Sequence, residues 1–456
     1  MSKILRDDAG ASGPRGLCAA IALALVSFGH ARPASAGAFE VIGVGPRGIA
    51  EAGALTARAT DGSAAFFNPA GLAMGRGVHV DIAPQLAGST LGVQGTTPEL
   101  VDPFGFVLLA DATLPFTGVL ADRFRVGIAL HVPTSGAIHL LVAPPGEPQF
   151  PYFANRTQRL VVEPALAIRV APWLAVGAGI NLLGGVAGPA DVRPGASGVP
   201  EPRIAIDATR QLALQAGVRV ELDEHVHLGA TYRQQFSVPV LVTTQAEIGG
   251  IGLTADIDLQ HALFDPHTVV LGAAFDVDRL EVELDVAYSV WSAYDGPGLA
   301  IRAELPGALL TSEEQPRVFR DVVTVRAAGS YGFDVGRSSE LVLHAGTGFE
   351  PTFLTGASQG TANLADGSKI FGGLGVSFAL RGVLPKTLRF AAGLGGTFVL
   401  PQTVEKLACS ATPCAPGTVV GPDPDRPSEG IQNPGYPRLE SGGTLLTGSL
   451  GVGVDL

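Results

Sequence analysis

Charged residues recur at every second position in several apolar segments, and this pattern has the clearest chemical potential in the chain. In the segment 280–290, Glu281, Glu283 and Asp285 alternate with apolar or aromatic residues. Alternate side chains of a strand point to opposite faces, so these carboxylates share one face. Seven charged residues on such faces are candidates for ligand binding or ion pairing: Arg125, Arg159, Arg326, Arg389, Glu281, Glu283 and Asp285. Either the arginines bind an anionic headgroup, or the set forms a salt-bridged wall in which Glu283 and Asp285 pair with Arg326.

Cysteine and histidine pairs offer two further chemistries. Cys409 and Cys414 lie in a segment rich in Pro, Gly and Thr, where an oxidising compartment favours a loop disulfide. A metal pair is the weaker alternative, because no histidine is near them in the sequence. His225 and His227 share a strand face, but a position beside a turn favours solvated side chains over a metal site. No metal is therefore expected.

Motifs for cofactors or catalysis are weak. The segment 43–48 (GVGPRG) fits the dinucleotide fingerprint, but no strand-helix-strand unit follows it, so no cofactor is expected. A lipase needs a serine next to a histidine, and His344 has Ser338 and Ser339 close to it only in sequence. The sequence therefore predicts that the chain is not an enzyme.

Composition limits the fold. The chain of 456 residues has a net charge of -12, which argues against binding to nucleic acid. Its mean hydropathy is +0.32, yet the only long apolar run lies near the N-terminus. In a bilayer only helices and closed barrels satisfy all backbone hydrogen bonds, and a spanning helix needs about 20 apolar residues. The dispersed apolar residues, together with 61 glycines, favour a β-barrel.

The N-terminus has the organisation of a secretory signal peptide. Lys3, Arg6 and Arg15 precede the apolar run 17–26, and Ala34-Ser35-Ala36 follows it. Basic, apolar and small-residue zones in this order predict cleavage after Ala36. An exported chain with dispersed β-type hydrophobicity is expected in the outer membrane of a Gram-negative cell, crossing it many times.

Period-two alternation extends from about residue 77 to the end of the chain, in segments of the length needed to cross a bilayer. About fourteen strands are predicted, an even number as bacterial barrels require. They lie near residues 77–88, 104–115, 122–132, 158–170, 173–185, 204–221, 225–236, 267–276, 279–291, 319–332, 339–347, 369–380, 386–399 and 443–456. Short and long connectors alternate between them, as periplasmic turns and outer loops do. The long ones are interpreted as loops.

A short segment before the barrel has a different character. Residues 48–59 are rich in Ala and Gly and predict a short helix. Asp61-Gly62 ends it, and Asn68-Pro69 begins another turn, with Asn as N-cap and Pro at the first helical position. We therefore expect a signal peptide at 1–36, a small helical plug at 37–76 and an all-β transmembrane barrel at 77–456.

This order of features resembles the FadL/TodX family. The residues that carry the resemblance are Gly45-Pro46-Arg47-Gly48 and the run from Asp61 through Asn68-Pro69-Ala70-Gly71-Leu72, followed by about fourteen strands. The family consists of outer-membrane transporters of long-chain fatty acids and other hydrophobic compounds. The resemblance implies a monomeric barrel closed by an N-terminal hatch, with sideways release of the cargo through a gap in the wall. It implies these hatch residues: Asp61, Phe66, Phe67, Asn68, Pro69, Ala70 and Gly71.

The predicted function is passive transport of a long-chain fatty acid or hydrocarbon, in contact with outer-membrane lipid and lipopolysaccharide. Candidates for the wall gap are Gly127, Pro133 and Pro164, since proline lacks the donor that strand pairing needs. Two alternatives share the barrel. One is a general porin, and the other is a hatch-containing barrel that serves as a surface or secretion-assembly component.

Overall fold

The structure is a computed structural model of the chain. It describes residues 38–93, 104–134, 150–153, 160–187, 190–194, 200–204, 207–248, 251–294, 296, 298–305, 308–311, 319–356, 364–382, 386–406 and 437–456. The expected signal peptide, Arg159, Cys409 and Cys414 lie outside these residues. Among the residues described, no helix is long and apolar enough to cross a membrane.

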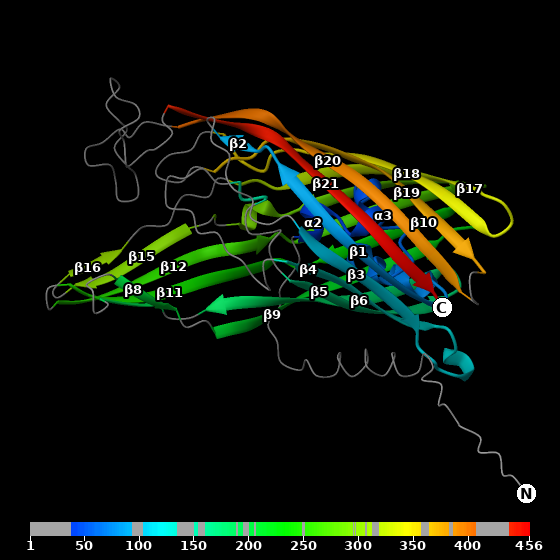
Figure 1. The fold of residues 1–456 in the computed structure, drawn as a ribbon, viewed down its shortest axis with the longest axis horizontal. Helices are drawn as coiled ribbons and strands as arrows, with labels where there is room; N and C mark the ends of the chain where they lie inside the picture. The colour runs from blue at the N-terminus through cyan, green and yellow to red at the C-terminus, as the bar shows by residue number, and fades with distance from the viewer. Residues whose placement is uncertain are drawn as a thin grey trace, which may run out of the picture.

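Fourteen antiparallel strands form a closed barrel, as the alternation predicted (Figure 1). Each pairs with its neighbours in chain order, and the first pairs with the last to close the cylinder. A two-residue strand, β2 (Gly92–Val93), joins the edge of the last one. The barrel strands are β1 (Val78–Ser89), β3 (Phe104–Thr113), β4 (Phe124–Pro133), β5 (Val161–Ala171), β6 (Leu174–Ala187), β9 (Asp207–Glu221), β10 (Val226–Arg233), β13 (Thr268–Val277), β14 (Leu280–Ser289), β17 (Val322–Asp334), β18 (Ser339–Glu350), β19 (Lys369–Arg381), β20 (Thr387–Glu405) and β21 (Arg438–Asp455).

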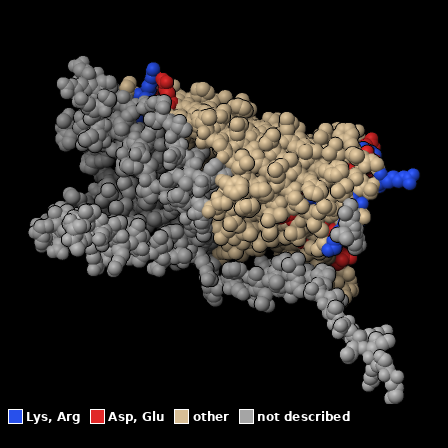
Figure 2. Space-filling model, viewed as in Figure 1, with Lys and Arg blue, Asp and Glu red and all other residues tan. Residues whose placement is uncertain are grey.

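The wall has an apolar outside and a polar inside. On β14, Leu284 is 50% exposed whereas Glu283 and Asp285 are 3% and 0% exposed. On the face seen in Figure 2, charged side chains gather towards the two ends of the barrel and leave a broad uncharged band between them. Such a band is what a bilayer requires of a barrel surface. The alternation seen in the sequence therefore separates lipid-facing from lumen-facing positions.

Three of the long connectors are not simple loops, which corrects the expectation from the sequence. They contribute six strands to a second sheet with the order β16-β15-β12-β11-β7-β8. Figure 1 shows this sheet beyond the barrel, at the end opposite the C-terminus. The strands are β7 (Ala190–Pro194), β8 (Pro200–Ile204), β11 (Phe236–Ile248), β12 (Ile251–Asp265), β15 (Gly298–Leu305) and β16 (Ala308–Thr311). Segments outside the bilayer can pair with one another, and their β-branched residues favour strands.

The N-terminal segment 38–76, called the plug below, lies inside the barrel (Figure 1). It contains α2 (Ala38–Ile42), α3 (Gly45–Ala50), α4 (Ala64–Phe67) and a 3-10 helix, η1 (Pro69–Met74). Two further 3-10 turns, η2 (Gly118–Leu120) and η3 (Trp291–Ala293), belong to connectors. The helix expected over 48–59 stops at Ala50, because Ala52 and Gly53 adopt left-handed backbone conformations (φ 51° and 75°) that end a helix.

Candidate binding site beside the N-terminal plug

Asn68 joins two parts of the plug to the barrel wall. It is fully buried, and its Oδ1 accepts a hydrogen bond of 3.1 Å from the Ala70 backbone N–H. Its Nδ2 donates to the carbonyl oxygens of Thr56 (2.9 Å) and of Val218 on β9 (3.0 Å). Pro69, which needs no N–H partner, begins η1 directly after this cap. One amide side chain therefore caps a helix and holds it against the wall.

Replacing Asn68 with Ala should loosen the plug. The cap alone is worth about 1 kcal/mol, and each of the two abandoned carbonyls adds about 1–3 kcal/mol if it stays unsatisfied. We expect increased leakage of a small hydrophilic solute through a barrel that remains folded. Asn68→Asp, which keeps the cap acceptor but cannot donate, should give an intermediate leakage. Wild-type leakage in both variants would show that Asn68 does not hold the plug.

The other residues of the motif pack tightly around this cap. Asp61 accepts hydrogen bonds from the backbone N–H (2.9 Å) and hydroxyl (2.5 Å) of Ser63, which turns the chain before α4. Phe66 lies edge-on to Phe67, with ring centroids 5.1 Å apart. Gly71 meets the Ala59 carbonyl so closely that any side chain would overlap with it. Six of the predicted hatch residues are buried together, namely Phe66, Phe67, Asn68, Pro69, Ala70 and Gly71, whereas Asp61 is partly exposed.

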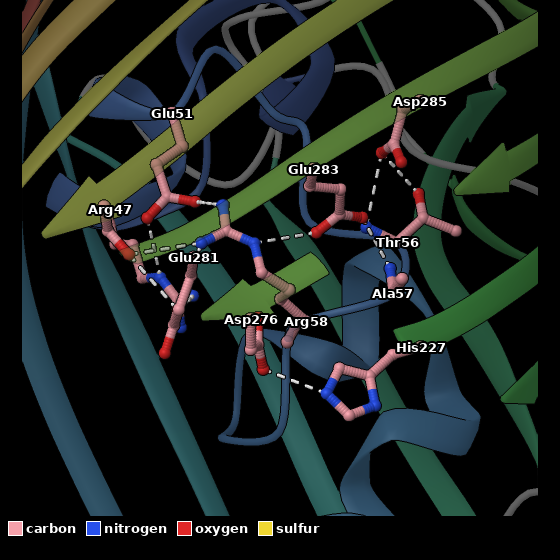
Figure 3. A network of polar contacts seen from close by, with 12 residues as sticks. Arg47, Glu51, Thr56, Ala57, Arg58, His227, Asp276, Glu281, Glu283 and Asp285 are labelled. Atoms are coloured by element: carbon pink, nitrogen blue, oxygen red, sulfur yellow. Dashed lines mark hydrogen bonds and ion pairs between the residues drawn. The ribbon is translucent and has the colours of Figure 1, made fainter. Parts of the chain in front are cut away.

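Two carboxylates of β14 bind the plug rather than Arg326 (Figure 3). Glu283 accepts a hydrogen bond of 2.6 Å from the Ala57 backbone N–H. Asp285 accepts a hydrogen bond of 2.7 Å from the Thr56 hydroxyl, and a longer one of 3.3 Å from the Thr56 N–H. Arg326 lies opposite Asp285 in the β14–β17 ladder, but no ion pair between them is formed. The predicted pairing with Arg326 is therefore not formed, and donors of the plug bind these carboxylates instead.

Arg58 of the plug, itself buried, is the centre of an ionic network (Figure 3). Its Nε donates to Glu283 (3.1 Å) and its Nη1 to Glu281 (3.1 Å), while Nη2 contacts Glu51. Glu51 also pairs with Arg47 at 3.1 Å. This group, called the plug latch below, consists of Arg47, Glu51, Arg58, Glu281 and Glu283.

Glu51 stays ionised in the plug latch. Burial by itself would raise the pKa of its carboxyl group, but Arg47, His344 and Arg58 outweigh burial and lower the pKa to about 2. The pKa of Glu51 is lower in the folded protein than its ordinary value. The ion pairs of Glu51 therefore stabilise the fold at any pH above that ordinary pKa. This contribution is lost only as the pH falls towards 2.

His344 contacts a serine that the sequence did not suggest. Its Nε2 lies 2.9 Å from the Ser377 hydroxyl on β19, and its Nδ1 lies 2.7 Å from Glu51. The order of contacts is that of a Ser-His-acid triad. However, Glu51 is already paired with two arginines, and Ser377 lies within continuous ladders on both sides. No pair of backbone donors is free there to form an oxyanion hole, so the arrangement anchors the plug.

The remaining predicted arginines lie in different places. Arg125 is buried on β4 and contacts Asp111, with a further hydrogen bond of 2.6 Å to Thr113. Arg389 on β20 bridges Asp81 (2.8 Å) and Asp455 (3.1 Å), which lie on the two strands that close the barrel. Arg326 is half-buried and approaches the Phe371 ring at 5.6 Å. Among the described residues, no carboxylate forms an ion pair with it.

One cavity lies between the plug and the end of the barrel that carries the long connectors, and it is called the upper cavity below. It has a volume of about 100 Å³. Aromatic rings from the plug, a connector and β19 line it, together with three cations. Arg233 hydrogen-bonds the Phe66 carbonyl (3.0 Å), and Lys369 pairs with Asp366 (2.8 Å) and Glu350 (3.3 Å). Arg326 is the third cation. The rings are those of Phe39, Phe66, Phe67, Tyr152, Phe153 and Phe371.

The lower cavity, on the other side of the plug, has a different lining. Its volume is about 510 Å³, and it reaches the short turns around Asp278 and Asp334. Its lining mixes charged side chains, among them Arg47, Asp61 and Arg389, with apolar ones such as Val107 and Phe378. The plug therefore separates a cavity rich in aromatic rings from one that holds more charged groups.

Among the described residues, no cluster of three or more His, Cys, Asp or Glu could hold a metal ion; the alternative of a metal at Cys409 and Cys414 lies outside these residues. His227 instead pairs with Asp276 (2.9 Å) and Glu221 on the barrel wall. The predicted site residues did not include Arg58, Glu51 or the connector residue Tyr152. The one available signal was that Arg47, Glu51 and Arg58 are charges in an otherwise small and apolar segment.

A closed fourteen-stranded barrel with an apolar outer band and a lumen filled by its own N-terminus defines a class, the plugged β-barrels of the outer membrane. The sequence profile of the family described as "Outer membrane protein transport protein (OMPP1/FadL/TodX)" matches residues 28–393. The chain belongs to this family, and its members are transport proteins rather than enzymes.

Solved structures show the same fold at low sequence identity. A FadL homologue of Pseudomonas aeruginosa is 15% identical with a TM-score of 0.53, over 90% of this chain and 98% of that one. The CymD monoaromatic hydrocarbon channel is 14% identical with a TM-score of 0.51, over 92% and 99% of the two chains. No curated protein sequence is significantly similar to this chain.

Proposed function

We propose that the chain is a passive transporter that captures long-chain fatty acids or other hydrophobic small molecules from outside the cell. The difference in polarity between the two cavities carries this proposal. Aromatic rings are concentrated in the upper cavity, whereas the lower cavity holds more charged side chains beside apolar ones. Burying an apolar cargo above the plug gains about 0.8 kcal/mol per methylene, and the charged side chains of the lower cavity reduce this gain there.

The relatives support a hydrophobic cargo. Their titles name a FadL homologue and a monoaromatic hydrocarbon channel. In this chain, the rings of Phe39, Phe66 and Phe371 line an upper cavity of about 100 Å³, which suits one small aromatic ring or part of an acyl chain. Arg326, which forms no ion pair with a carboxylate among the described residues, suits the headgroup of an acid.

A lateral exit through the wall follows from the same chemistry, because cargo that leaves sideways stays in an apolar environment. Of the three candidate positions, Pro164 coincides with an interruption in strand pairing. Between β5 and β6 the partners are Val162↔Leu182 and Ala165↔Gly179, and the two positions between them are unpaired. Gly127 is paired on both sides, and Pro133 is paired with β3. We place the exit at Pro164, with release controlled by movement of the plug.

The two alternatives make different demands on the structure. A general porin needs an open lumen, but the plug fills this one with fully buried residues such as Leu55 and Ala64. A surface or assembly component could use the outer sheet of β7, β8, β11, β12, β15 and β16, and would show no cargo uptake. A single chain closes the barrel through β1 and β21, which suits a monomer surrounded by lipid and lipopolysaccharide.

Uptake of labelled oleate and toluene by cells that lack their own transporter tests the proposal. Restored uptake of either compound would establish hydrophobic transport. If neither compound enters while the protein is folded in the outer membrane, the transport proposal fails and the surface role gains weight.

Arg326→Gln should distinguish acids from hydrocarbons. A charge-assisted hydrogen bond contributes about 1.5–3 kcal/mol, so oleate affinity should fall about tenfold to a hundredfold. Uptake of toluene, which has no charge, should be unchanged. Arg279→Gln, at an exposed short turn, is the matched control and should affect neither compound. Equal losses for both compounds would show that Arg326 supports the pocket rather than binding a headgroup.

A further inference from the structure

The unpaired positions of the wall between β5 and β6 contain a polar side-chain pair. Glu163 precedes Pro164 on β5, and Asn181 lies across from it on β6, where backbone pairing is absent. The two side chains are 1% and 3% exposed. Asn181 Nδ2 donates a hydrogen bond to Glu163 Oε1. A side-chain contact therefore spans the wall at the point where the ladder is interrupted.

The second oxygen of each side chain in this pair is an acceptor that receives no hydrogen bond. Glu163 Oε2 and Asn181 Oδ1 are buried and have no hydrogen-bond partner. Leaving a buried acceptor unsatisfied costs about 1–3 kcal/mol. One proton on Glu163 would satisfy both atoms, because the acid O–H could then donate to the amide oxygen. The result is a cyclic acid–amide pair with two hydrogen bonds, one in each direction.

A second interruption in the barrel is closed in another way. Between β1 and β21 the partners are Ile82↔Val452 and Gln85↔Ser449, so Pro84 and its neighbour Ala83 are paired with β3 but not with β21. There the Ser449 hydroxyl donates to the Pro84 carbonyl (2.9 Å). The plug residue Pro46 also packs against Gly451 at this seam. A single side chain bonded to a backbone carbonyl spans this gap, whereas a contact between two side chains spans the gap at Pro164.

We propose that Glu163 and Asn181 form a clasp that closes the lateral exit, and that cargo leaves the barrel when this clasp opens. The inference rests on the proposed transport function and adds the positioning residues that control release. The charged groups that act on Glu163 are Arg233 of the upper cavity, Glu40 of α2 and Asp265 at the end of β12. Arg233 hydrogen-bonds Phe66 and Glu40 (3.3 Å), so it links the plug and the upper cavity to the clasp.

A reversible cross-link tests the clasp directly. Glu163→Cys with Asn181→Cys, in a background where Cys409 and Cys414 are replaced by Ser, can be locked by oxidation and released by reduction. We expect the oxidised variant to lose most of its uptake of oleate or toluene and the reduced variant to regain it. The matched control is Ile168→Cys with Val176→Cys, which joins the same strands where they are already paired. Its uptake should not respond to oxidation.

Single substitutions separate the clasp from a merely structural role. Glu163→Gln can form both hydrogen bonds with Asn181 and should keep the wild-type uptake rate. Asn181→Leu can form neither, so release should no longer be restrained and uptake should rise. Uptake that persists in the oxidised cross-linked variant would overturn the clasp while leaving transport intact. Absence of uptake in the wild type would instead overturn the proposed function.

Discussion

Replacing Arg58 with Met is expected to release the plug from the barrel wall. The side chain of Arg58 is 3% exposed and pairs with Glu51, Glu281 and Glu283. Its removal leaves three carboxylates near one another without their shared cation. Breaking a buried ion pair from one side costs about 3–5 kcal/mol, which is comparable to the whole stability of many domains. The purified variant should conduct ions in a planar bilayer, and trypsin should cleave its plug.

Two further variants show whether this effect belongs to the plug latch. Arg279→Met removes an ion pair with Asp334 in which both side chains are more than half exposed. Such surface pairs contribute about 0–1 kcal/mol, so conductance should stay at the wild-type level. Adding Glu283→Gln to Arg58→Met removes one of the three carboxylate charges that lost their cation, and should recover part of the lost stability of the plug. An Arg58→Met variant that conducts no more than the wild type and resists trypsin would mean that packing alone holds the plug.

The barrel could be predicted from sequence because lipid and lumen impose a period of two on every wall strand. All fourteen predicted strands correspond to observed ones, and the short turns at Leu222–Glu224 and Val277–Asp278 lie between them. The outer sheet was not predicted, because the same periodicity was the only signal for strands. Its strands lie beyond the bilayer, where no such alternation is imposed.

The contacts of the plug could not be read from the sequence. Arg58 and Glu283 are 225 residues apart, and Thr56 and Asp285 are 229 apart. Alternation showed that Glu283 and Asp285 face the lumen, but it could not show which group they meet there. The upper cavity combines plug rings with Tyr152 from a connector that carries no periodic signal.

Glycines on the wall strands let the plug backbone touch the wall itself, and one of them gives the sharpest test of this contact. A Cβ added at Gly346 on β18 would lie 2.6 Å from the Glu51 Cα and would overlap with other backbone atoms of Glu51. Its ladder partner Gly373 meets Ile49 and Ala50 in the same way. Such contacts are with backbone atoms, which cannot move aside as a flexible side chain can.

Gly346→Val is therefore expected to displace the C-terminal end of α3 and, with it, Glu51 of the plug latch. Overpacking costs about 1–3 kcal/mol in a core that can adjust, and here the ion pairs of Glu51 would be lost as well. Gly88→Val on β1, where an added Cβ meets nothing within 4 Å, is the matched control. Valine favours strands, so both barrels should form, but only the Gly346 variant should leak small solutes and expose Arg47 to trypsin. If both variants stay closed, the plug has room to shift within the barrel, and direct backbone contact does not hold it in place.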